Sequence, residues 1–245
     1  MLRTVRENLK ACRRGLLMKV PKLGFANLTA LWWQDRAWMT PYRQHLYPDG
    51  RAGTRMLARR FMLIQLANSV SRLEGSTAEC GVARGTGSAV ICETLRDHYR
   101  NGDHHFAFDS FEGVSEPGVL DNESNGKTNW YKGKLSHDYV QVRERLQEFS
   151  FCQVVKGWIP DCFEGAAQSV EKFRFVHIDV DLYEPTKASL EFFVPRLVPG
   201  GIIVFDDHGF RNCPGARKAA EDYFADRPEA IVEMTTAQAF VTKAA

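Results

Sequence analysis

The sequence contains no long apolar run, because no stretch approaches the roughly 18 uncharged apolar residues that a membrane-spanning helix needs. It also has no low-complexity tract, internal repeat or obvious linker. Its hydrophobic content of 44% and charged content of 25% are ordinary for a globular protein. A chain of 245 residues can bury a substantial core unaided. We therefore expect a soluble protein with no membrane partner and no long disordered region.

Cysteine is sparse, since the chain has six and no two of them form a CxxC pair. Secreted proteins held by disulfides are usually short and dense in cysteine, and this chain is neither. Three of the six, Cys80, Cys92 and Cys152, lie in runs apolar enough to be buried. We therefore expect free thiols and a cytoplasmic location.

An excess of one charge is also lacking, because the formal net charge is +2 at pH 7. This balance gives no reason to expect a nucleic-acid partner. The first two dozen residues are an exception, and we interpret their positive charge as a solvated helix face; a transit-like peptide or an arm that attracts anions is the alternative. The basic residues there are Arg3, Arg6, Lys10, Arg13, Arg14, Lys19 and Lys22.

Apolar residues recur at helical spacing from residue 55 to residue 73. The chain before this helix is basic, aromatic and poorly periodic, so we divide the protein into an N-terminal helical or irregular extension over 1–54 and a main domain over 55–245. In the main domain, short apolar runs alternate with helical patterns. The predicted strands are 77–81, 105–109, 152–156, 173–179, 201–206, 231–234 and 239–241, and the further predicted helices are 87–99, 136–149, 160–170, 185–197 and 215–224.

The predicted strands are short and almost continuously apolar, which is typical of a parallel sheet with helices on both faces. The last two strands have no helix between them, so they must form an antiparallel hairpin. The sequence therefore predicts an α/β fold with a mainly parallel seven-stranded sheet that ends in an antiparallel C-terminal hairpin. In such sheets, ligands bind where the carboxyl ends of the strands meet the following loops.

A glycine-rich turn follows the first predicted strand, in the segment ECGVARGTG. Gly81 and Gly85 allow a sharp turn and a close approach to a ligand. The spacing is not the GxGxxG of dinucleotide-binding enzymes, and the carboxylate of Glu79 beside the turn disfavours a phosphate. A carboxylate suits a cation or an amine, and S-adenosylmethionine offers both a sulfonium and an amino group. A turn that merely joins strand to helix is the alternative.

The next two strands end in groups that suit the rest of this cofactor. Asp109 ends the second strand, where a carboxylate can accept hydrogen bonds from ribose hydroxyls, and Ser110 follows it; a helix cap or Asx turn is the alternative. Gly157, after the third strand, leaves room for a flat ring against the backbone. Trp158 is as often part of a core as part of a ligand-binding wall.

Aspartates follow both of the next two strands. Asp179 and Asp181 lie at the end of one, in FRFVHIDVDLYEPT, and Asp206 and Asp207 lie at the end of the other, in GGIIVFDDHGF. If these strands are neighbours, the carboxylates converge and repel one another unless a hard divalent cation binds them. Aspartate also caps helices, but two aspartates in each of two adjacent loops exceed what capping requires. The sequence therefore predicts a metal site.

Together these motifs resemble the macrocin O-methyltransferase (TylF-like) family over roughly residues 63–241. The resemblance rests on six ordered blocks, namely ECGVARG, FDSFEG, KGWIPD, HIDVDLYEPT, GGIIVFDDHG and GARKAAEDYF. It implies a Rossmann-like class I methyltransferase fold and Mg²⁺- and S-adenosylmethionine-dependent methylation of a sugar hydroxyl on a natural product. It also implies a small-molecule hydroxyl acceptor as partner and admits a homodimer.

The resemblance also implies roles for individual residues. Its metal ligands fall on Asp179, Asp206 and Asp207, and its cofactor positions include Glu79, Gly81 and Asp109. With the residues proposed from the strand ends, the predicted cofactor set is Glu79, Gly81, Gly85, Asp109, Ser110, Gly157, Trp158 and Asp179. The chain departs from related enzymes at Leu182, where some carry a basic Lys or His, and at His208, where Tyr is familiar.

Methyl transfer from a sulfonium is a displacement that needs alignment and a deprotonated oxygen nucleophile, and alignment alone is worth on the order of 7–11 kcal/mol. A bound Mg²⁺ would acidify a sugar hydroxyl. Asp179 or Asp181 is then the expected catalytic base, and we favour Asp181 because a carboxylate that binds metal is a weaker base.

Three other functions remain open at this level. The chain could methylate a catechol-like or other non-sugar hydroxyl, with or without a metal. It could be an NAD(P)-linked oxidoreductase, which the missing GxGxxG disfavours. It could also be a non-catalytic protein that binds S-adenosylmethionine, or one that binds a partner through its N-terminal aromatic residues.

The segment 114–135 shows neither helical nor strand periodicity. A connection of this length in a compact domain is usually a functional lid or disordered. Trp130 and Tyr131 near its end would be costly to expose, so we expect a lid that docks by its aromatic end.

Overall fold

The computed structural model describes residues 37–46, 54–123, 126–165 and 170–245. Most of the extension predicted over 1–54 lies outside these residues, so its role and its boundary stay predictions. Residues 44–245 form one compact unit, whereas the helical turn η2 (Ala37–Met39) belongs to the unit before it. Among the described residues, no helix is both long and apolar enough to cross a bilayer.

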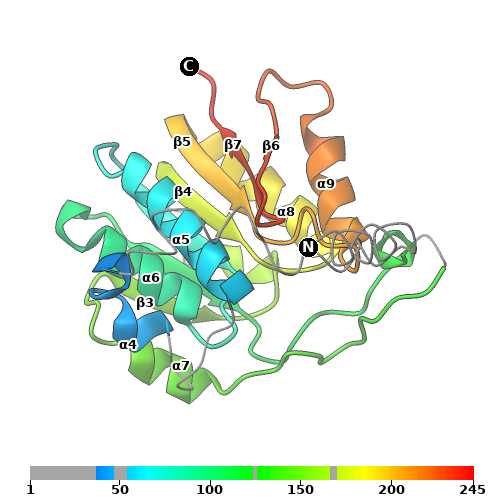
Figure 1. Ribbon diagram of the computed structural model, residues 1–245, viewed down its shortest axis with the longest axis horizontal. Coiled ribbons are helices and arrows are strands. Elements are labelled where there is room, and N and C mark those ends of the chain that lie inside the picture. Colours follow the sequence, from blue (N-terminus) through cyan, green and yellow to red (C-terminus); the bar gives the residue numbers. More distant parts are fainter. Residues whose placement is uncertain (1–36, 47–53, 124–125, 166–169) are drawn as a thin grey trace, which may run out of the picture. The chain divides into compact units, whose positions relative to one another are not determined.

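A seven-stranded sheet forms the centre of this unit, in the order β3-β2-β1-β4-β5-β7-β6 (Figure 1). The first five strands pair in parallel, and β7 pairs antiparallel with both β5 and β6. The predicted α/β sheet with its antiparallel hairpin is confirmed. The strands are β1 (Ser76–Cys80), β2 (His105–Asp109), β3 (Cys152–Lys156), β4 (Phe173–Ile178), β5 (Leu197–Phe205), β6 (Val232–Glu233) and β7 (Ala239–Thr242).

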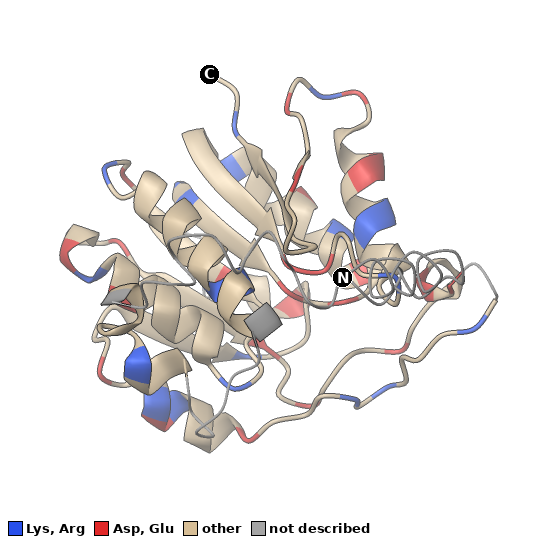
Figure 2. Cartoon of the chain, in the orientation of Figure 1, with Lys and Arg blue, Asp and Glu red and all other residues tan. Residues whose placement is uncertain are grey.

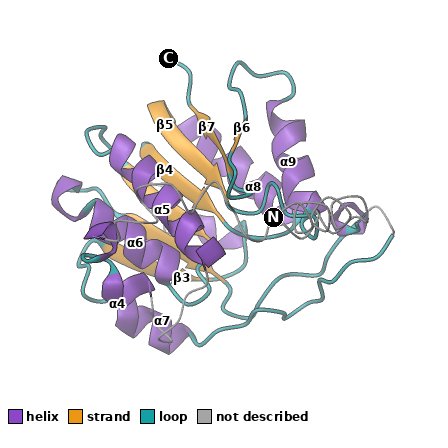
Figure 3. Ribbon diagram, in the orientation of Figure 1, coloured by secondary structure: helices purple, strands orange, loops and turns teal. Residues whose placement is uncertain are grey.

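Helices flank the sheet on both faces (Figure 3). They are α4 (Arg43–Leu46), α5 (Thr54–Ser69), α6 (Thr86–Thr94), α7 (Tyr139–Leu146), α8 (Tyr183–Phe193) and α9 (Pro214–Phe224), with short 3₁₀ turns η3 (Arg96–His98), η4 (Val119–Asp121), η5 (Asp161–Phe163) and η6 (Val194–Arg196). Charged residues lie mostly in the helices and loops, and the strands contain few of them (Figure 2). This distribution explains the continuous apolar pattern of the strand sequences.

Two apolar clusters hold the helices to the sheet. On one face, Phe193 of α8 and Phe224 of α9 pack against strand residues such as Phe205. On the other face, side chains of α6 and α7, including Ala89 and Leu146, pack together. Nearly every residue of β1 and β4 is buried on both faces, so these two central strands fix the position of the loops that follow them.

Several helix boundaries differ from the sequence prediction, among them the end of the helix predicted over 87–99, which stops at Thr94, and three of the differences have an evident cause. The helix expected over 160–170 is, in its described part, only the turn η5. The helix expected to reach residue 197 gives way to η6, where Pro195 lacks an amide hydrogen, and β5 begins at Leu197 and pairs with Phe173. Helix α7 begins late because Asp138 caps it, its side chain accepting hydrogen bonds from the amides of Val140 and Gln141.

The order in which the strands are added to the sheet reverses beside β1. The chain runs outward from β1 through β2 to β3, and then returns to place β4 on the other side of β1. In open α/β sheets the crevice beyond the carboxyl ends of such strands is the usual ligand site.

Candidate active site

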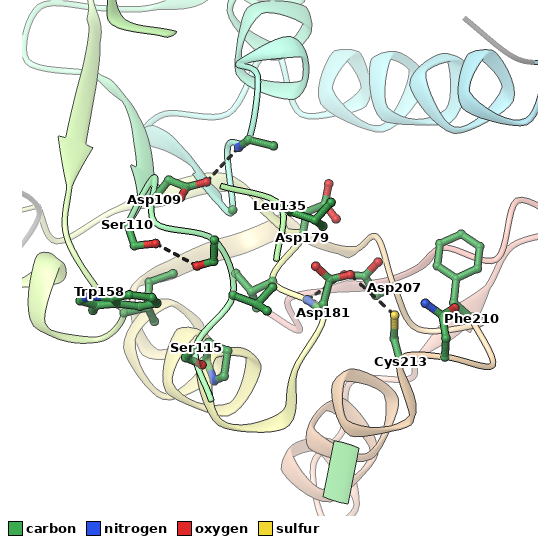
Figure 4. A pocket seen from close by; sticks show the side chains of 18 of the residues that line it. Asp109, Ser110, Ser115, Leu135, Trp158, Asp179, Asp181, Asp207, Phe210 and Cys213 are labelled. Atoms are coloured by element: carbon green, nitrogen blue, oxygen red, sulfur yellow. Dashed lines mark hydrogen bonds between the residues drawn. The ribbon is translucent and has the colours of Figure 1, made fainter. Parts of the chain in front are cut away.

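A cavity of about 600 Å³ opens at this switch point, beyond the carboxyl ends of β1, β2, β4 and β5. Its size lies within the usual range for small-molecule sites. The lining residues come from seven parts of the chain: α5, the ends of the first five strands with the loops that follow them, and the start of α8. In Figure 4, Asp109, Ser110 and Trp158 lie on one side and Asp179, Asp181 and Asp207 on the other.

The glycine turn after β1 has the backbone conformation that only glycine adopts easily. Gly81 has φ +84° and Gly85 has φ +80°. A Cβ on Gly81 would lie 1.9 Å from the carbonyl oxygen of Asp179, so the neighbouring β4 loop requires glycine there. Gly81 lines the cavity, whereas Gly85 lies against Val142 of α7 and does not. Packing within the protein therefore accounts for both glycines.

Asp109 lines the cavity and also holds the glycine turn. Its Oδ2 accepts hydrogen bonds from the amides of Val82 (2.7 Å) and Ala83 (2.8 Å), and its Oδ1 accepts one from Phe111 (2.6 Å). A carboxylate has about four acceptor positions, so one remains for a ligand hydroxyl. The neighbouring Ser110 also lines the cavity, and its hydroxyl donates to the Gly113 carbonyl (3.0 Å).

Glu79 lies under the cavity, outside its lining, with 1% of its surface exposed. Its Oε1 pairs with His177 Nδ1 (2.8 Å), and its Oε2 accepts a hydrogen bond from the Ser88 hydroxyl (2.5 Å). Burial raises the pKa of Glu79, but the hydrogen bond and charge of His177 and the charge of Arg60 outweigh burial and lower it. Glu79 is thus an ionised buried group that organises the floor of the site.

The two residues predicted after β3 differ in position. Trp158 lines the cavity, together with Ile159. Gly157 is not part of the lining, and a Cβ on it would lie 2.8 Å from the Cβ of Cys162. Glycine is therefore required at this position by the turn that follows the strand.

At the other side of the cavity, Asp179, Asp181 and Asp207 present carboxylates to the same space (Figure 4). Asp181 has φ +62°, a left-handed conformation that strains a residue other than glycine. Its amide donates to Asp207 Oδ2 (3.0 Å), and its Oδ1 lies 3.7 Å from the Cys213 thiol. Strain of this kind often accompanies function, because the surrounding structure must hold the residue in place.

Burial and mutual repulsion penalise the charges of these aspartates. Burial and the Asp179 carboxylate raise the pKa of Asp181 to about 7. Burial, followed by the carboxylates of Asp181 and Asp179, raises the pKa of Asp207 well above its usual value. A divalent cation would relieve this repulsion, and carboxylate oxygens are the ligands that Mg²⁺ prefers.

Asp206 differs from the other three because it does not line the cavity, although one of its carboxylate oxygens lies within 4.8 Å of one of Asp179. It is fully buried and accepts a hydrogen bond from Gln238 Nε2 (2.6 Å). His177 Nε2 lies 3.3 Å from it, and Arg59 contacts its other oxygen. Arg59 also lies 4.0 Å from Asp179. Two groups of potential metal ligands result, one formed by His177, Asp179 and Asp206 and one by Asp181, Asp207 and Cys213.

The donor chemistry of these residues fits a hard divalent cation. Asp179, Asp181 and Asp207 supply the carboxylates that face the cavity, and Asp206 lies behind them. The cavity as a whole also fits S-adenosylmethionine, because its volume is sufficient and the buried guanidinium of Arg60 has nitrogen atoms without a protein partner.

Several lining residues were not predicted from the sequence. Arg59 and Arg60 project from α5, which precedes the sheet, and Phe210 and Asn212 come from the loop before α9. Two adjacent arginines beside the apolar residues of this helix were the available signal for the first pair. The second pair carries no motif. His208 is one of the two positions at which the sequence departs from the family pattern. It is buried and does not line the cavity.

The segment 114–135 packs against the acidic side of the cavity. Trp130 is buried and donates its ring N–H to the carbonyl of Asn212 (2.6 Å). Lys134 lies over the Trp130 ring at 4.3 Å. Tyr131, expected to dock with it, is 64% exposed. Asp121 anchors the middle of the segment, since it accepts a hydrogen bond from the amide of Tyr183 (2.8 Å).

Comparison with known proteins agrees with this geometry. The family model for macrocin O-methyltransferase (TylF) matches residues 48–236. The 8-demethyl-8-(2,3-dimethoxy-alpha-L-rhamnosyl)-tetracenomycin-C 4'-O-methyltransferase of Streptomyces olivaceus is 32% identical over 157 residues, which are 61% of this chain and 58% of that protein. Demethyldecarbamoylnovobiocin O-methyltransferase of Streptomyces niveus is 24% identical, over 63% of this chain and 60% of that protein.

Solved structures share the fold. The O-methyltransferase NovP superposes with a TM-score of 0.65 at 20% identity, covering 84% of this chain and 88% of its own. The calicheamicin methyltransferase CalS11 has a TM-score of 0.66 at 21% identity, with coverages of 78% and 80%. The family match spans more than three quarters of the sequence, including both sides of the cavity. The chain therefore belongs to the macrocin O-methyltransferase (TylF) family.

Proposed function

We propose that the protein transfers a methyl group from S-adenosylmethionine to a hydroxyl of a small molecule, and that this hydroxyl belongs to a sugar of a natural product. Family membership supports the reaction, and the names of the tetracenomycin and novobiocin relatives support an acceptor of this class. We further propose that catalysis requires a divalent cation, Mg²⁺ in the first instance.

One observation carries the proposal. A single cavity joins the side formed by Gly81, Asp109 and Trp158 to the side formed by Asp181 and Asp207. A methyl donor bound on the first side would point its reactive end at an acceptor on the second. Holding two reactants in this way replaces a bimolecular encounter by a step within one complex, which can be worth about 7–11 kcal/mol.

On the cofactor side, the protein supplies a preformed turn and an apolar wall. Asp109 holds the turn through the amides of Val82 and Ala83 and keeps one acceptor position for a ribose hydroxyl. Trp158 and Ile159 provide the surface against which a flat ring packs.

On the acceptor side, Asp179 and Asp207 would hold the cation, with Asp206 as a further ligand if its contact with Arg59 gives way. The bound cation supplies Lewis acidity, which makes a sugar hydroxyl easier to deprotonate. Asp181 would accept the proton, because its carboxylate faces the same cavity and is not among the residues that we assign to the cation. The Cys213 thiol and the strained backbone of Asp181 hold that carboxylate in position.

The experiment incubates purified protein with S-adenosylmethionine, Mg²⁺ and a panel of rhamnosylated aromatic polyketides, with simple catechols alongside, and follows products by mass spectrometry. We expect methylated sugar product and S-adenosylhomocysteine in equal amounts. The matched variant Asp181→Asn keeps the side-chain size, so it should retain S-adenosylhomocysteine binding and lose turnover. Methylation of catechols alone would move the assignment to non-sugar acceptors, and no binding of S-adenosylhomocysteine would refute it.

A further inference from the structure

Arg60 is a buried cation in the cavity wall without a full set of partners. It projects from α5, has 9% of its surface exposed and lines the cavity. Its Nε and Nη1 atoms have no hydrogen-bond partner. Burying a guanidinium whose N–H groups are unsatisfied is costly, so such an arrangement persists only if something offsets it.

The neighbouring carboxylates provide charge but no hydrogen bond. Asp179 and Glu79 are the carboxylates whose negative charges favour the charged form of Arg60. Both oxygens of Glu79 are already engaged, one by His177 and one by Ser88. Asp179 faces the cavity and, on its other side, Arg59. Arg60 therefore lines the cavity with a guanidinium of which two nitrogens, Nε and Nη1, are buried and have no protein acceptor.

The local backbone makes room for this arrangement at Gly87. A Cβ on Gly87 would lie 3.1 Å from Arg60 Nη1 and 1.8 Å from Glu79 Oε1. Any larger residue would push the guanidinium and the carboxylate apart. The first turn of α6 thus keeps a cation and an anion side by side at the edge of the cavity.

The backbone of the glycine turn cannot replace Arg60 as an anion donor. The amide of Gly81 donates to the Phe108 carbonyl, and those of Val82 and Ala83 donate to Asp109. The amide of Gly85 donates to the carbonyl of Val82. These amides are spent on the turn itself, in contrast to phosphate-binding loops, whose free amides bind the ligand.

We propose that Arg60 binds the α-carboxylate of the amino-acid portion of S-adenosylmethionine, an inference that rests on the function proposed above. The carboxylate is the cofactor's one anionic group, and guanidinium is the side chain best matched to it in shape and charge. This contact would satisfy the free N–H groups of Arg60 and fix the amino-acid end of the cofactor beside Gly81 and Glu79.

The test measures which ligand groups Arg60 recognises, by calorimetric titration without turnover. The ligands are S-adenosylhomocysteine and its decarboxylated analogue S-adenosyl-3-thiopropylamine, which keeps the amine and lacks the carboxylate. The wild-type protein should prefer S-adenosylhomocysteine. Arg60→Met should weaken its binding roughly ten- to a hundredfold and leave the analogue's affinity unchanged or higher, so the preference disappears.

Arg72→Met is the matched control, because it removes one positive charge from an exposed position just after α5. It should keep the wild-type preference. Arg60→Lys keeps the charge and loses the planar fork, so it should show a reduced preference; if Arg60→Met does not fold, this variant decides. An undiminished preference in a folded Arg60 variant would overturn the proposal. Wild-type protein that binds neither ligand would instead refute the proposed function.

Discussion

The two sides of the cavity differ in how their carboxylates are satisfied. Asp109, on the cofactor side, accepts three backbone hydrogen bonds. Asp181 and Asp207, on the acidic side, have between them one backbone amide and one thiol, and burial together with neighbouring carboxylates raises the pKa of both. Asp109 is the last residue of β2, and Asp181 and Asp207 follow β4 and β5 of the same sheet. The difference therefore lies in the loops and not in the strands.

The two sides of the cavity therefore differ in how far they are stabilised before a ligand binds. On the cofactor side the glycine turn is held by hydrogen bonds within the protein, so a ligand adds contacts to a turn that already has its shape. The acidic side places like charges together at a cost, and that cost is recovered only when a cation binds. Ligand binding should hence change the stability of the acidic side more than that of the cofactor side. Four experiments test this difference, from the largest expected effect to the smallest.

Removal of divalent metal should have the largest effect. Exhaustive chelation is expected to lower turnover roughly a thousandfold, because a metal that polarises the acceptor is worth several kcal/mol of barrier. Affinity for S-adenosylhomocysteine should change little, since the cofactor side is formed by the protein alone. The check is kcat with and without added Mg²⁺, next to calorimetric binding of the product. Full activity after chelation would exclude the metal, and a parallel loss of cofactor binding would show that the two sides are not independent.

Asp109→Ala should affect the cofactor side and spare the metal. It removes three hydrogen bonds that hold the turn and one acceptor for the ribose. Charge-assisted hydrogen bonds contribute roughly 1.5–3 kcal/mol each, so binding of S-adenosylhomocysteine should weaken at least tenfold. Mg²⁺ affinity should stay within a factor of about two. Unaltered cofactor binding would mean that Asp109 serves neither the turn nor the ribose.

The sequence predicted the sheet well, because each central strand is buried on both faces and therefore reads as an apolar run. The bounds of β2 and β3 agree residue for residue. The helix expected over 160–170 was wrong in its described part because apolar residues such as Phe163 pack under the sheet from a 3₁₀ turn. The spacing of apolar residues indicates which residues are buried, and a buried turn can produce the same spacing as a buried helix.

The candidate site was predictable only in part. The acidic side could be predicted because aspartates that follow neighbouring parallel strands are expected to meet at the same edge of the sheet. The sequence could not show which of Asp206 and Asp207 faces the cavity. Adjacent residues of an extended chain point in opposite directions, and in the structure only Asp207 lines the cavity. It also could not place Arg59 and Arg60, because their approach to the cavity depends on how α5 packs against α6 and β5.

Trp130→Ala should weaken acceptor use without affecting the cofactor. Trp130 ties the segment 114–135 to Asn212, which lines the cavity on its acidic side. Losing this anchor is expected to raise the acceptor KM about tenfold, equivalent to about 1.4 kcal/mol. The exposed Tyr131→Ala serves as the control and should have little effect. Equal effects on KM and on S-adenosylhomocysteine binding would show that the segment supports the fold and not the acceptor site.

Asp207→Asn should give the smallest effect, but one of opposite sign to that of Asp109→Ala. The metal-free protein is expected to become more stable by about 1 kcal/mol, or roughly 2–4 °C in Tm, because a neutral amide removes a buried charge that its neighbours repel. An asparagine oxygen can still accept the Asp181 amide. The pKa of Asp207 is raised in the folded state, so its destabilising effect grows as pH rises from the ordinary aspartate pKa towards the raised one. The gain in Tm should therefore be larger at pH 8 than at pH 5. Saturating Mg²⁺ should reverse the order, stabilising the wild type more than the variant.

The neighbouring Asp206→Asn is the contrasting case, since it disturbs contacts with Gln238, His177 and Arg59 and should lower Tm. If both variants lower Tm and Mg²⁺ stabilises neither protein, the aspartates on this side of the cavity act as structural groups.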